Sequence, residues 1–162
     1  KRITTPVTTD DTAATLTDRL QQLGCAALTD VLQLLPTGSL QAEPQDQAAV
    51  TYAHKLQKEE ARIDWSRPAT DIHNQIRALY PRSPAWTQHE GKRLRLIRAR
   101  PGSEVANAAP GTVLAVSAHS LVIACGSGVL EVFDVQTEGK PVMSVGSLLN
   151  GHPDYFRRGQ CL

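Results

Sequence analysis

The sequence predicts a mixed α+β chain in which one long amphipathic helix and a linker precede a small, open barrel of five or six short strands. Apolar residues recur at three- and four-residue intervals within residues 12–35, as they do on one face of a helix. Residues 36–50 carry Pro, Gly and Gln and have no apolar period. Short runs with strand character, divided by turn signals, then follow one another between residues 85 and 135.

The first predicted element is a helix over residues 12–35 with a single apolar stripe. The stripe consists of Leu16, Leu20, Leu23, Ala27, Val31 and Leu34. Thr9, Asp10 and Asp11 offer capping side chains and carboxylates to the first turn, while Pro36 and Gly38 end the helix. The first fifty residues contain no partner helix or sheet for the stripe, so we expect something else to lie against it.

A second, shorter helix is expected after an extended segment over residues 50–56. Ser66 is its candidate cap, and Pro68 is tolerated in a first helical turn. Its short apolar face consists of Ile72, Ile76 and Leu79. The Tyr-Pro pair at residues 80–81 is expected to end it.

Five runs with strand character follow, at residues 85–88, 94–99, 111–116, 121–125 and 129–135. Gly126-Ser-Gly128 between the last two is typical of a hairpin turn and not of a phosphate-binding loop. Closing the strands into a barrel removes exposed edges, and the five-stranded Greek-key barrel often binds nucleic acid. Leu148 and Leu149 are expected on a last helical turn before the tail.

The composition is that of a soluble globular protein, with 41% apolar and 20% charged residues among 162. No apolar run is long enough to cross a membrane and no signal peptide is present, so we expect a cytoplasmic protein. Cys25, Cys125 and Cys161 are far apart and odd in number, which favours reduced thiols. The five His residues have no metal-ligand spacing, so no metal site is expected.

Positive charge is concentrated in the middle of the chain. Residues 55–100 carry eleven Lys or Arg and five Asp or Glu. The cations are Lys55, Lys58, Arg62, Arg67, Arg77, Arg82, Lys92, Arg93, Arg95, Arg98 and Arg100. Such a cluster can neutralise phosphates, which is the salt-sensitive part of nucleic-acid affinity. The alternative is an ordinary solvated surface, in which Glu59 and Glu60 pair with neighbouring cations.

The strand expected around residues 92–100 would present part of this cluster as a ridge. One side carries Leu94, Leu96 and Arg98, and the other carries Arg93, Arg95, Ile97 and Ala99. Arg93 and Arg95 are the exposed pair, and Lys92 and Arg100 flank them. At about 3.3 Å per residue, the ridge is comparable in length with several phosphate spacings.

The aromatic and acidic residues indicate a function less clearly than the basic residues do. Aromatic residues make up only 4% of the chain, so Trp65 and Trp86 are expected to pack in the core or between domains, not to stack unpaired bases. Recognition of folded RNA by shape and phosphate fits better. Glu59, Glu60 and Asp64 could be imagined as an acid/base set, but no nucleophile or oxyanion feature accompanies them. We therefore expect no catalytic residue.

Several stretches carry a family resemblance. They are residues 51–56 (TYAHKL), 58–65 (KEEARIDW), 76–78 (IRA), 109–112 (APGT) and 148–150 (LLN), with Trp86 and the pair Gly139-Lys140. In these stretches the chain resembles the C-terminal part of the methionyl-tRNA formyltransferase family. Residues 3–8 (ITTPVT) and the helix from residue 11 to residue 20 look like the last strand and helix of that family's catalytic domain.

The resemblance implies a domain organisation. Residues 1–38 would be the C-terminal end of the α/β formyltransferase catalytic domain, residues 39–56 a linker, and residues 57–162 a barrel similar to the oligonucleotide-binding (OB) fold. The chain starts without Met on a stretch that looks like the exit from a strand, so we expect a C-terminal portion that lacks most of the catalytic domain. That missing domain, or another copy of the chain, would cover the helix at residues 12–35.

The resemblance also implies a function. The family formylates initiator methionyl-tRNA from 10-formyltetrahydrofolate in translation initiation, and its catalytic Asn, His and Asp and its folate site would precede residue 1. We therefore expect this chain to bind no cofactor and to bind and position the tRNA. The expected tRNA-binding residues are Lys55, Lys58, Arg62, Arg77, Arg82, Lys92, Arg93, Arg95, Arg98 and Lys140. Arg82 stands where the family usually has Trp and adds a cation.

Two other interpretations stay open. The chain could be a non-catalytic RNA-binding barrel that has kept the family's surface without its enzyme domain. It could also be the C-terminal module of another formyl-folate enzyme, such as a sugar-nucleotide formyltransferase or formyltetrahydrofolate dehydrogenase. The basic cluster argues against the last interpretation, because those substrates need no long phosphate track.

Overall fold

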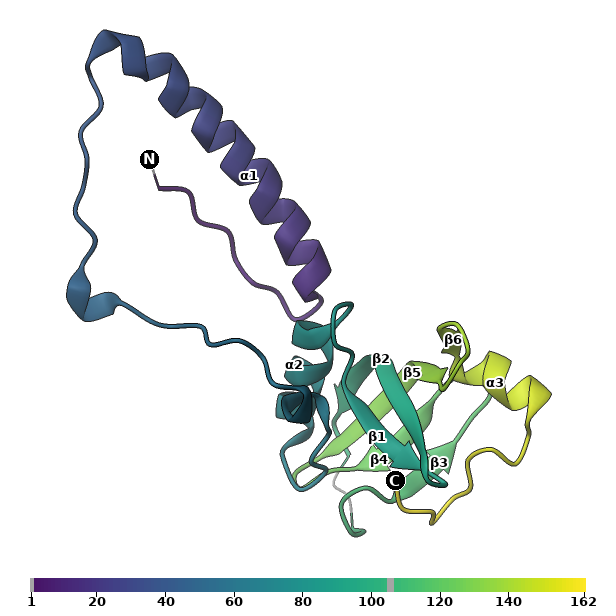
Figure 1. Cartoon of the computed structure of the whole chain (residues 1–162). Helices are drawn as coiled ribbons and strands as arrows, with labels where there is room; N and C mark the ends of the chain where they lie inside the picture. The colour runs from purple at the N-terminus through teal and green to yellow at the C-terminus, as the bar shows by residue number, and fades with distance from the viewer. Residues whose placement is uncertain (1, 105–106) are drawn as a thin grey trace. The chain divides into compact units, whose positions relative to one another are not determined.

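The computed structural model describes residues 2–104 and 107–162. The chain divides into two compact units, Lys1–Leu56 and Gln57–Leu162. The first unit contains the long helix α1 (Ala13–Leu34), and the second contains helix α2 (Ala69–Leu79), strands β1 to β6 and helix α3 (Val145–Gly151) (Figure 1). The assignment of residues 1–38 to a catalytic domain and of residues 39–56 to a linker stays a prediction.

Helix α1 begins where two threonines satisfy its first N–H groups. Thr12 is the N-cap: its hydroxyl accepts a hydrogen bond from the Thr15 N–H at 3.2 Å, and the Thr15 hydroxyl accepts one from the Thr12 N–H at 2.9 Å. The prediction that residues 9–11 cap this helix is therefore wrong. After α1 the chain tightens into the 3₁₀ turn Leu35–Thr37 and then turns at Gly38, whose φ of +64° is left-handed.

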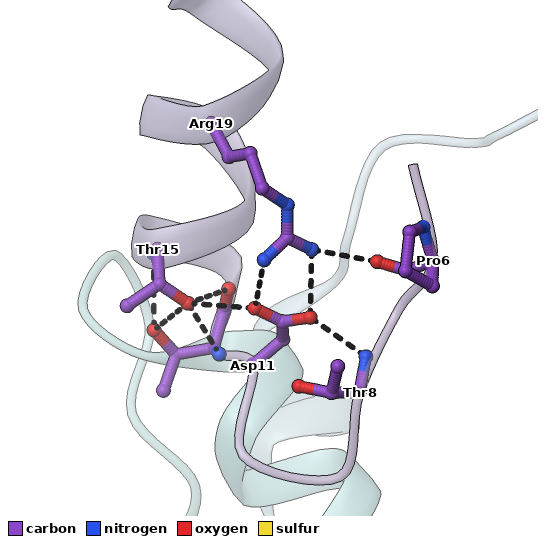
Figure 2. A network of polar contacts seen from close by, with 6 residues as sticks. Pro6, Thr8, Asp11, Thr15 and Arg19 are labelled. Atoms are coloured by element: carbon purple, nitrogen blue, oxygen red, sulfur yellow. Dashed lines mark hydrogen bonds and ion pairs between the residues drawn. The ribbon is translucent and has the colours of Figure 1, made fainter. Parts of the chain in front are cut away.

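Asp11 ties the segment before α1 to the helix, as Figure 2 shows. Its buried carboxylate accepts two hydrogen bonds from the Arg19 guanidinium, at 2.9 and 2.8 Å, and one from the Thr8 N–H at 2.7 Å. Arg19 also donates to the Pro6 carbonyl oxygen at 2.7 Å. The bonds from Arg19, followed by the backbone bond from Thr8, hold the pKa of Asp11 well below its ordinary value.

The apolar stripe of α1 is present and is only partly covered, because four of its six residues are half-buried and two are exposed. Among the residues that the structure describes, none on α1 is buried, and Leu20 and Leu34 are 50% and 46% exposed. The remainder of the first unit is extended chain with one further 3₁₀ turn at Gln47–Ala49. The cover expected for this stripe stays a prediction.

The second unit is built on one antiparallel sheet. Its strands are β1 (Trp86–His89), β2 (Lys92–Gly102), β3 (Val113–Val116), β4 (Leu121–Ala124), β5 (Val129–Thr137) and β6 (Met143–Ser144). The order in the sheet is β1-β2-β5-β4-β3, and β6 pairs with β5 where β4 leaves it. The sheet curls into an open, OB-like barrel (Figure 1), which confirms the predicted fold class. Strand β6 was not predicted.

The pairing of β2 with β5 is interrupted at one place. The register shifts on both sides of Arg98, which leaves Ile97 on β2 and Phe133 on β5 outside the ladder. Leu96 and Ala99 are therefore both buried although they are three positions apart, and Arg98 is exposed. The prediction that Arg98 lies on the side of Leu96, and Ala99 on the other side, is wrong because a two-residue period does not continue across this irregularity.

The C-terminal tail joins the two outer strands of the sheet. The Val113 N–H on β3 donates to the Gln160 carbonyl oxygen at 2.8 Å, and the Leu162 N–H donates to the Gly111 carbonyl oxygen at 3.0 Å. The side chain of Gln160 lies 2.8 Å from the ring of His89, which is buried at the end of β1. The tail thus covers strand edges that would otherwise be exposed.

Helix α2 packs against β2 and β5. Its buried residues are Ala69, Ile72, Ile76 and Leu79. The predicted Ser66 cap is wrong, because Pro68 is the N-cap and Asp64 binds both the Ser66 hydroxyl, at 2.7 Å, and the Ser66 N–H, at 3.0 Å. The predicted end of the helix is confirmed, with Tyr80 as its C-cap.

A close backbone contact joins the β4–β5 turn to the segment before α2. The Gly126 N–H donates to the carbonyl oxygens of Trp65 and Arg67, at 2.8 and 3.0 Å. A Cβ at residue 126 would stand 1.7 Å from the Ser66 carbonyl oxygen, which belongs to the backbone and cannot rotate away. Glycine is therefore required here for space.

We expect Gly126→Ala to destabilise the second unit by about 2 to 3 kcal/mol, because the added methyl group overpacks against backbone. Gly151→Ala is the matched control, since nothing lies within 4 Å of a Cβ added there. Denaturant unfolding followed by fluorescence of Trp65 and Trp86 measures both variants. Equal unfolding midpoints would contradict the close contact.

We expect the Asp11–Arg19 pair to persist in mild acid. Because the pKa of Asp11 is lowered in the folded state, the pair's contribution is fully present above the unfolded value of about 3.9 and is lost only as pH falls through the lower folded value. Amide protection factors in the first two turns of α1 should thus be unchanged between about pH 6 and pH 5 and lower in Asp11→Asn. Asp10→Asn, at an exposed position, is the control. Equal protection in both variants would rule out this role.

Candidate nucleic-acid interface

A groove of about 570 Å³ lies where β1 and β2 meet the segment before α2, and we call it the basic groove. Its lining residues are Lys58, Glu59, Ala61, Arg62, Arg82, Ser83, Pro84, Trp86, Arg93 and Arg95. Five of these are cations and only Glu59 is an acid. A smaller hollow of about 80 Å³ shares Arg93 and Arg95 with the groove and continues to the turn at residues 136–139.

Trp86 stands among three arginines of the basic groove. Its backbone faces Arg95 in the β1–β2 register and forms a parallel bridge with Arg62. Its ring centre lies 4.3 Å from the guanidinium carbon of Arg93 and 5.9 Å from that of Arg62, both within cation–π distance. One residue therefore brings together arginines from separate segments of the chain.

The segment that carries Arg62 is held in place by side chains from the barrel. Gln75 on α2 donates to the carbonyl oxygens of Glu60 and Arg62, at 2.6 and 3.1 Å. The indole N–H of buried Trp65 donates to the hydroxyl of Thr87 on β1 at 3.2 Å. This wall of the groove is thus fixed both to α2 and to β1.

The cations in the first half of β2 have no acidic partner among the residues that the structure describes. Lys92 and Arg93 are exposed and make no ion pair with any described residue, and neither does Arg95. Arg95 is half-buried and donates to the neutral side chain of Gln136 at 2.9 Å. Their positive charge is therefore not balanced within the fold.

The cations in the second half of β2 are balanced. Arg98 donates to Asp134, and Arg100 pairs with Glu131 at 2.7 Å. Both guanidinium groups also lie over the ring of Phe133, at 4.8 and 5.2 Å from its centre. The ridge that the sequence predicts along the whole strand is thus divided, and its unbalanced charge lies in the first half.

The structure brings five of the ten predicted tRNA-binding residues together in the basic groove, namely Lys58, Arg62, Arg82, Arg93 and Arg95. Arg98 is paired, and Arg77 on α2 is half-buried and donates to Asn74 at 2.9 Å. Lys92 and Lys140 are exposed outside the groove, and Lys55 is exposed in the first unit.

Trp86 and Gln75 shape the site but were not singled out in the sequence for this role. Trp65 is buried as expected. Trp86 is half-buried, because its side chain packs on the core and also lines the groove. An aromatic residue on a strand next to a strongly basic strand was the available signal for Trp86. Gln75 had none, because its bonds are to backbone carbonyl oxygens that only the fold brings near.

The candidate acid/base residues and the buried thiol are not arranged for catalysis. Ser66, through its hydroxyl and then its N–H, holds the pKa of Asp64 below its ordinary value, whereas a general acid needs a raised pKa. Glu60 is used as a cap and accepts from the Gln57 N–H at 2.7 Å. Burial raises the pKa of Cys125 to about 11, so this thiol stays protonated at neutral pH.

Neither a metal centre nor a membrane helix is found in the part of the chain that the structure describes. No group of three or more His, Cys, Asp or Glu residues there could hold a metal ion. None of the helices there combines the length and apolar character that a membrane span requires.

A small barrel that follows a basic segment has a match among protein families. The family described as "Formyl transferase, C-terminal domain" matches residues 55–153. The chain belongs to this family. This match, together with the curated relative described next, confirms the resemblance seen in the sequence.

A curated relative extends the formyl transferase match to nearly the whole chain. The methionyl-tRNA formyltransferase of Hahella chejuensis (strain KCTC 2396) is 44% identical over 158 residues. The match covers 98% of this chain and 50% of that enzyme, so the chain spans about half the length of its relative.

Solved structures of HypX from Aquifex aeolicus share the fold of this formyl transferase domain. One HypX variant has a TM-score of 0.69 and 19% identity, over 90% of this chain and 27% of HypX. HypX in complex with tetrahydrofolic acid has a TM-score of 0.59 and 21% identity, over 75% of this chain and 22% of HypX. At such low identity the likeness concerns the fold alone.

We expect Gln75→Ala to loosen the wall of the basic groove, because the carbonyl oxygens of Glu60 and Arg62 lose their partner. Hydrogen exchange over residues 58–63 should become faster, while exchange in β4 and β5 stays unchanged. Gln88→Ala, an exposed glutamine on β1, is the control. The same exchange rates in both variants would show that Gln75 does not hold the segment.

Proposed function

We propose that this formyl transferase C-terminal domain binds initiator methionyl-tRNA with its basic groove and holds the methionyl end for N-formylation. The observation that carries the proposal is the set of unbalanced cations that line one groove of the barrel. The name of the Hahella relative, methionyl-tRNA formyltransferase, supports the choice of this RNA.

Unbalanced cations suit a phosphate backbone. A cation with an acidic partner must share or lose that partner before it can bind a phosphate, whereas an unpaired cation exchanges only water and counterions. Arg62, Arg82 and Arg93 make no ion pair with any residue in the described ranges. Their guanidinium edges carry parallel N–H donors that match two oxygens of one phosphate.

The role of this domain in formylation would be positioning. Contacts with the tRNA, remote from the reacting amine, can fix its geometry and lower the entropic part of the barrier. The chemistry, with 10-formyltetrahydrofolate as formyl donor, would belong to a catalytic domain, and we assign no catalytic or folate-binding residue to this chain. Translation initiation implies a cytoplasmic location.

We expect Arg93→Ala to lower the affinity for initiator tRNA about fivefold to tenfold and to reduce the slope of log affinity against log salt by about 1. The removed side chain is an exposed cation without an acidic partner, so one phosphate contact is lost. Fluorescence anisotropy with labelled tRNA over a salt series measures both quantities.

Arg100→Ala is the matched control for this prediction. It removes the same charge from the same strand, but from a cation already paired with Glu131. Its effect on affinity should stay below about threefold. Equal losses in the two variants would mean that only net charge matters, and an unchanged chain that does not bind tRNA at low salt would overturn the proposed function itself.

A further inference from the structure

The barrel contains two aromatic rings that each hold a pair of arginines. Phe133 on β5 lies 4.8 and 5.2 Å from Arg98 and Arg100, and Trp86 on β1 lies 4.3 and 5.9 Å from Arg93 and Arg62. The two clusters are alike in composition and geometry. They differ in what the edges of the guanidinium groups bind.

At Phe133 the edges are occupied. Arg98 donates its Nε–H to Asp134 and Arg100 donates its Nε–H to Glu131, so each guanidinium over this ring has a carboxylate partner. The positive charges of this cluster are therefore balanced within the fold.

At Trp86 the edges are open. A guanidinium over an aromatic ring uses its face for the contact and keeps its N–H edge available for an anion. No acidic partner for Arg62 or Arg93 is found among the described residues, and both line the basic groove. The cluster therefore lacks the anion that its counterpart at Phe133 has.

Trp86 is held by both its backbone and its side chain. The Trp86 carbonyl oxygen accepts a hydrogen bond from the Ile63 N–H at 2.8 Å, and the Trp86 backbone pairs with Arg95 on β2. The Trp86 side chain packs on the core. A fixed ring limits the freedom of the arginines that lie over it. Such preorganisation raises affinity by reducing the entropy lost when a ligand binds.

We propose that Trp86 is a positioning residue that holds Arg62 and Arg93 over its ring so that their open edges bind phosphates of the RNA backbone. The proposal rests on the proposed function and deepens it, because it names the residue that holds two of the phosphate-binding arginines in place. The N–H edges of Arg62 and Arg93 match the oxygens of a phosphate, so the ligand that we propose for the cluster is a phosphate.

The test is a mutant cycle of tRNA affinity with the 162-residue chain. Trp86→Leu as the only substitution should lower the affinity for tRNA about fivefold to tenfold. Its salt slope should stay within about 0.3 of the original, because all cations remain. In the Arg62→Ala, Arg93→Ala background, the same Trp86→Leu change should lower affinity by less than about twofold, since the groups through which it acts are gone.

Phe133→Leu is the matched control, because it removes the same kind of ring from an arginine pair whose edges are occupied. It should leave tRNA affinity unchanged. Trp86→Phe should restore most of the affinity lost in Trp86→Leu, since a ring is present again. Unfolding midpoints of all variants identify any loss of fold, and amide exchange in β2 shows whether the strand is intact.

Each outcome decides the question. If Trp86→Leu weakens binding equally in both backgrounds, the ring contacts the RNA directly and the positioning role is wrong. If Trp86→Leu does not weaken binding, or if it does so only through lost stability, the role is also wrong. If the chain without substitutions binds tRNA but neither Arg93→Ala nor Trp86→Leu changes the affinity, the tRNA binds to another surface.

Discussion

The irregular pairing between β2 and β5 is the constraint on which the barrel and its charged surface depend. At Ile97 and Phe133 both strands leave the ladder and lose their two-residue alternation at the same level. Irregularities of this kind bend and twist strands, and curling is what turns a sheet into a barrel. The same feature turns Arg98 outward and places it opposite Asp134. One backbone irregularity thus separates the balanced cations of β2 from the unbalanced ones.

The basic groove is assembled against electrostatic repulsion, which the fold has to offset. Five cations and one acid line it, and like charges that share a groove repel one another unless a counter-charge is present. Gln75 fixes one wall by its bonds to backbone, and Trp86 fixes two guanidinium groups through its ring. These contacts hold the cations without neutralising them. An anionic ligand would supply the missing counter-charge, which is why the groove is the better candidate site than the balanced surface around Phe133.

Local patterns in the sequence were sufficient for the elements, and long-range contacts decided the rest. The stripe of α1, the end of α2 at Tyr80 and the hairpin turn after β4 follow from residue period and turn chemistry. The predicted alternation of side chains along β2 was wrong beyond Ile97, because the irregularity there depends on the pairing of β2 with a strand distant in the sequence. The prediction of a Ser66 cap was wrong because the Ser66 hydroxyl donates to Asp64. The sequence located the basic segment, but which of its cations are balanced depends on acids that lie on β5.

The two units of the chain differ in the partners that their surfaces suit. Residues 1–54 carry three Lys or Arg against six Asp or Glu, and α1 has no buried residue in the part of the chain that the structure describes. An acidic segment is repelled by phosphates, while exposed apolar surface favours burial at about 25 cal/mol per Å². The surface of α1 therefore suits a protein partner, whereas the basic groove suits an anionic ligand. The contacts of Trp65 and Gln75 that fix the basic groove lie within the second unit. The affinity for phosphate that we propose should therefore reside in the barrel.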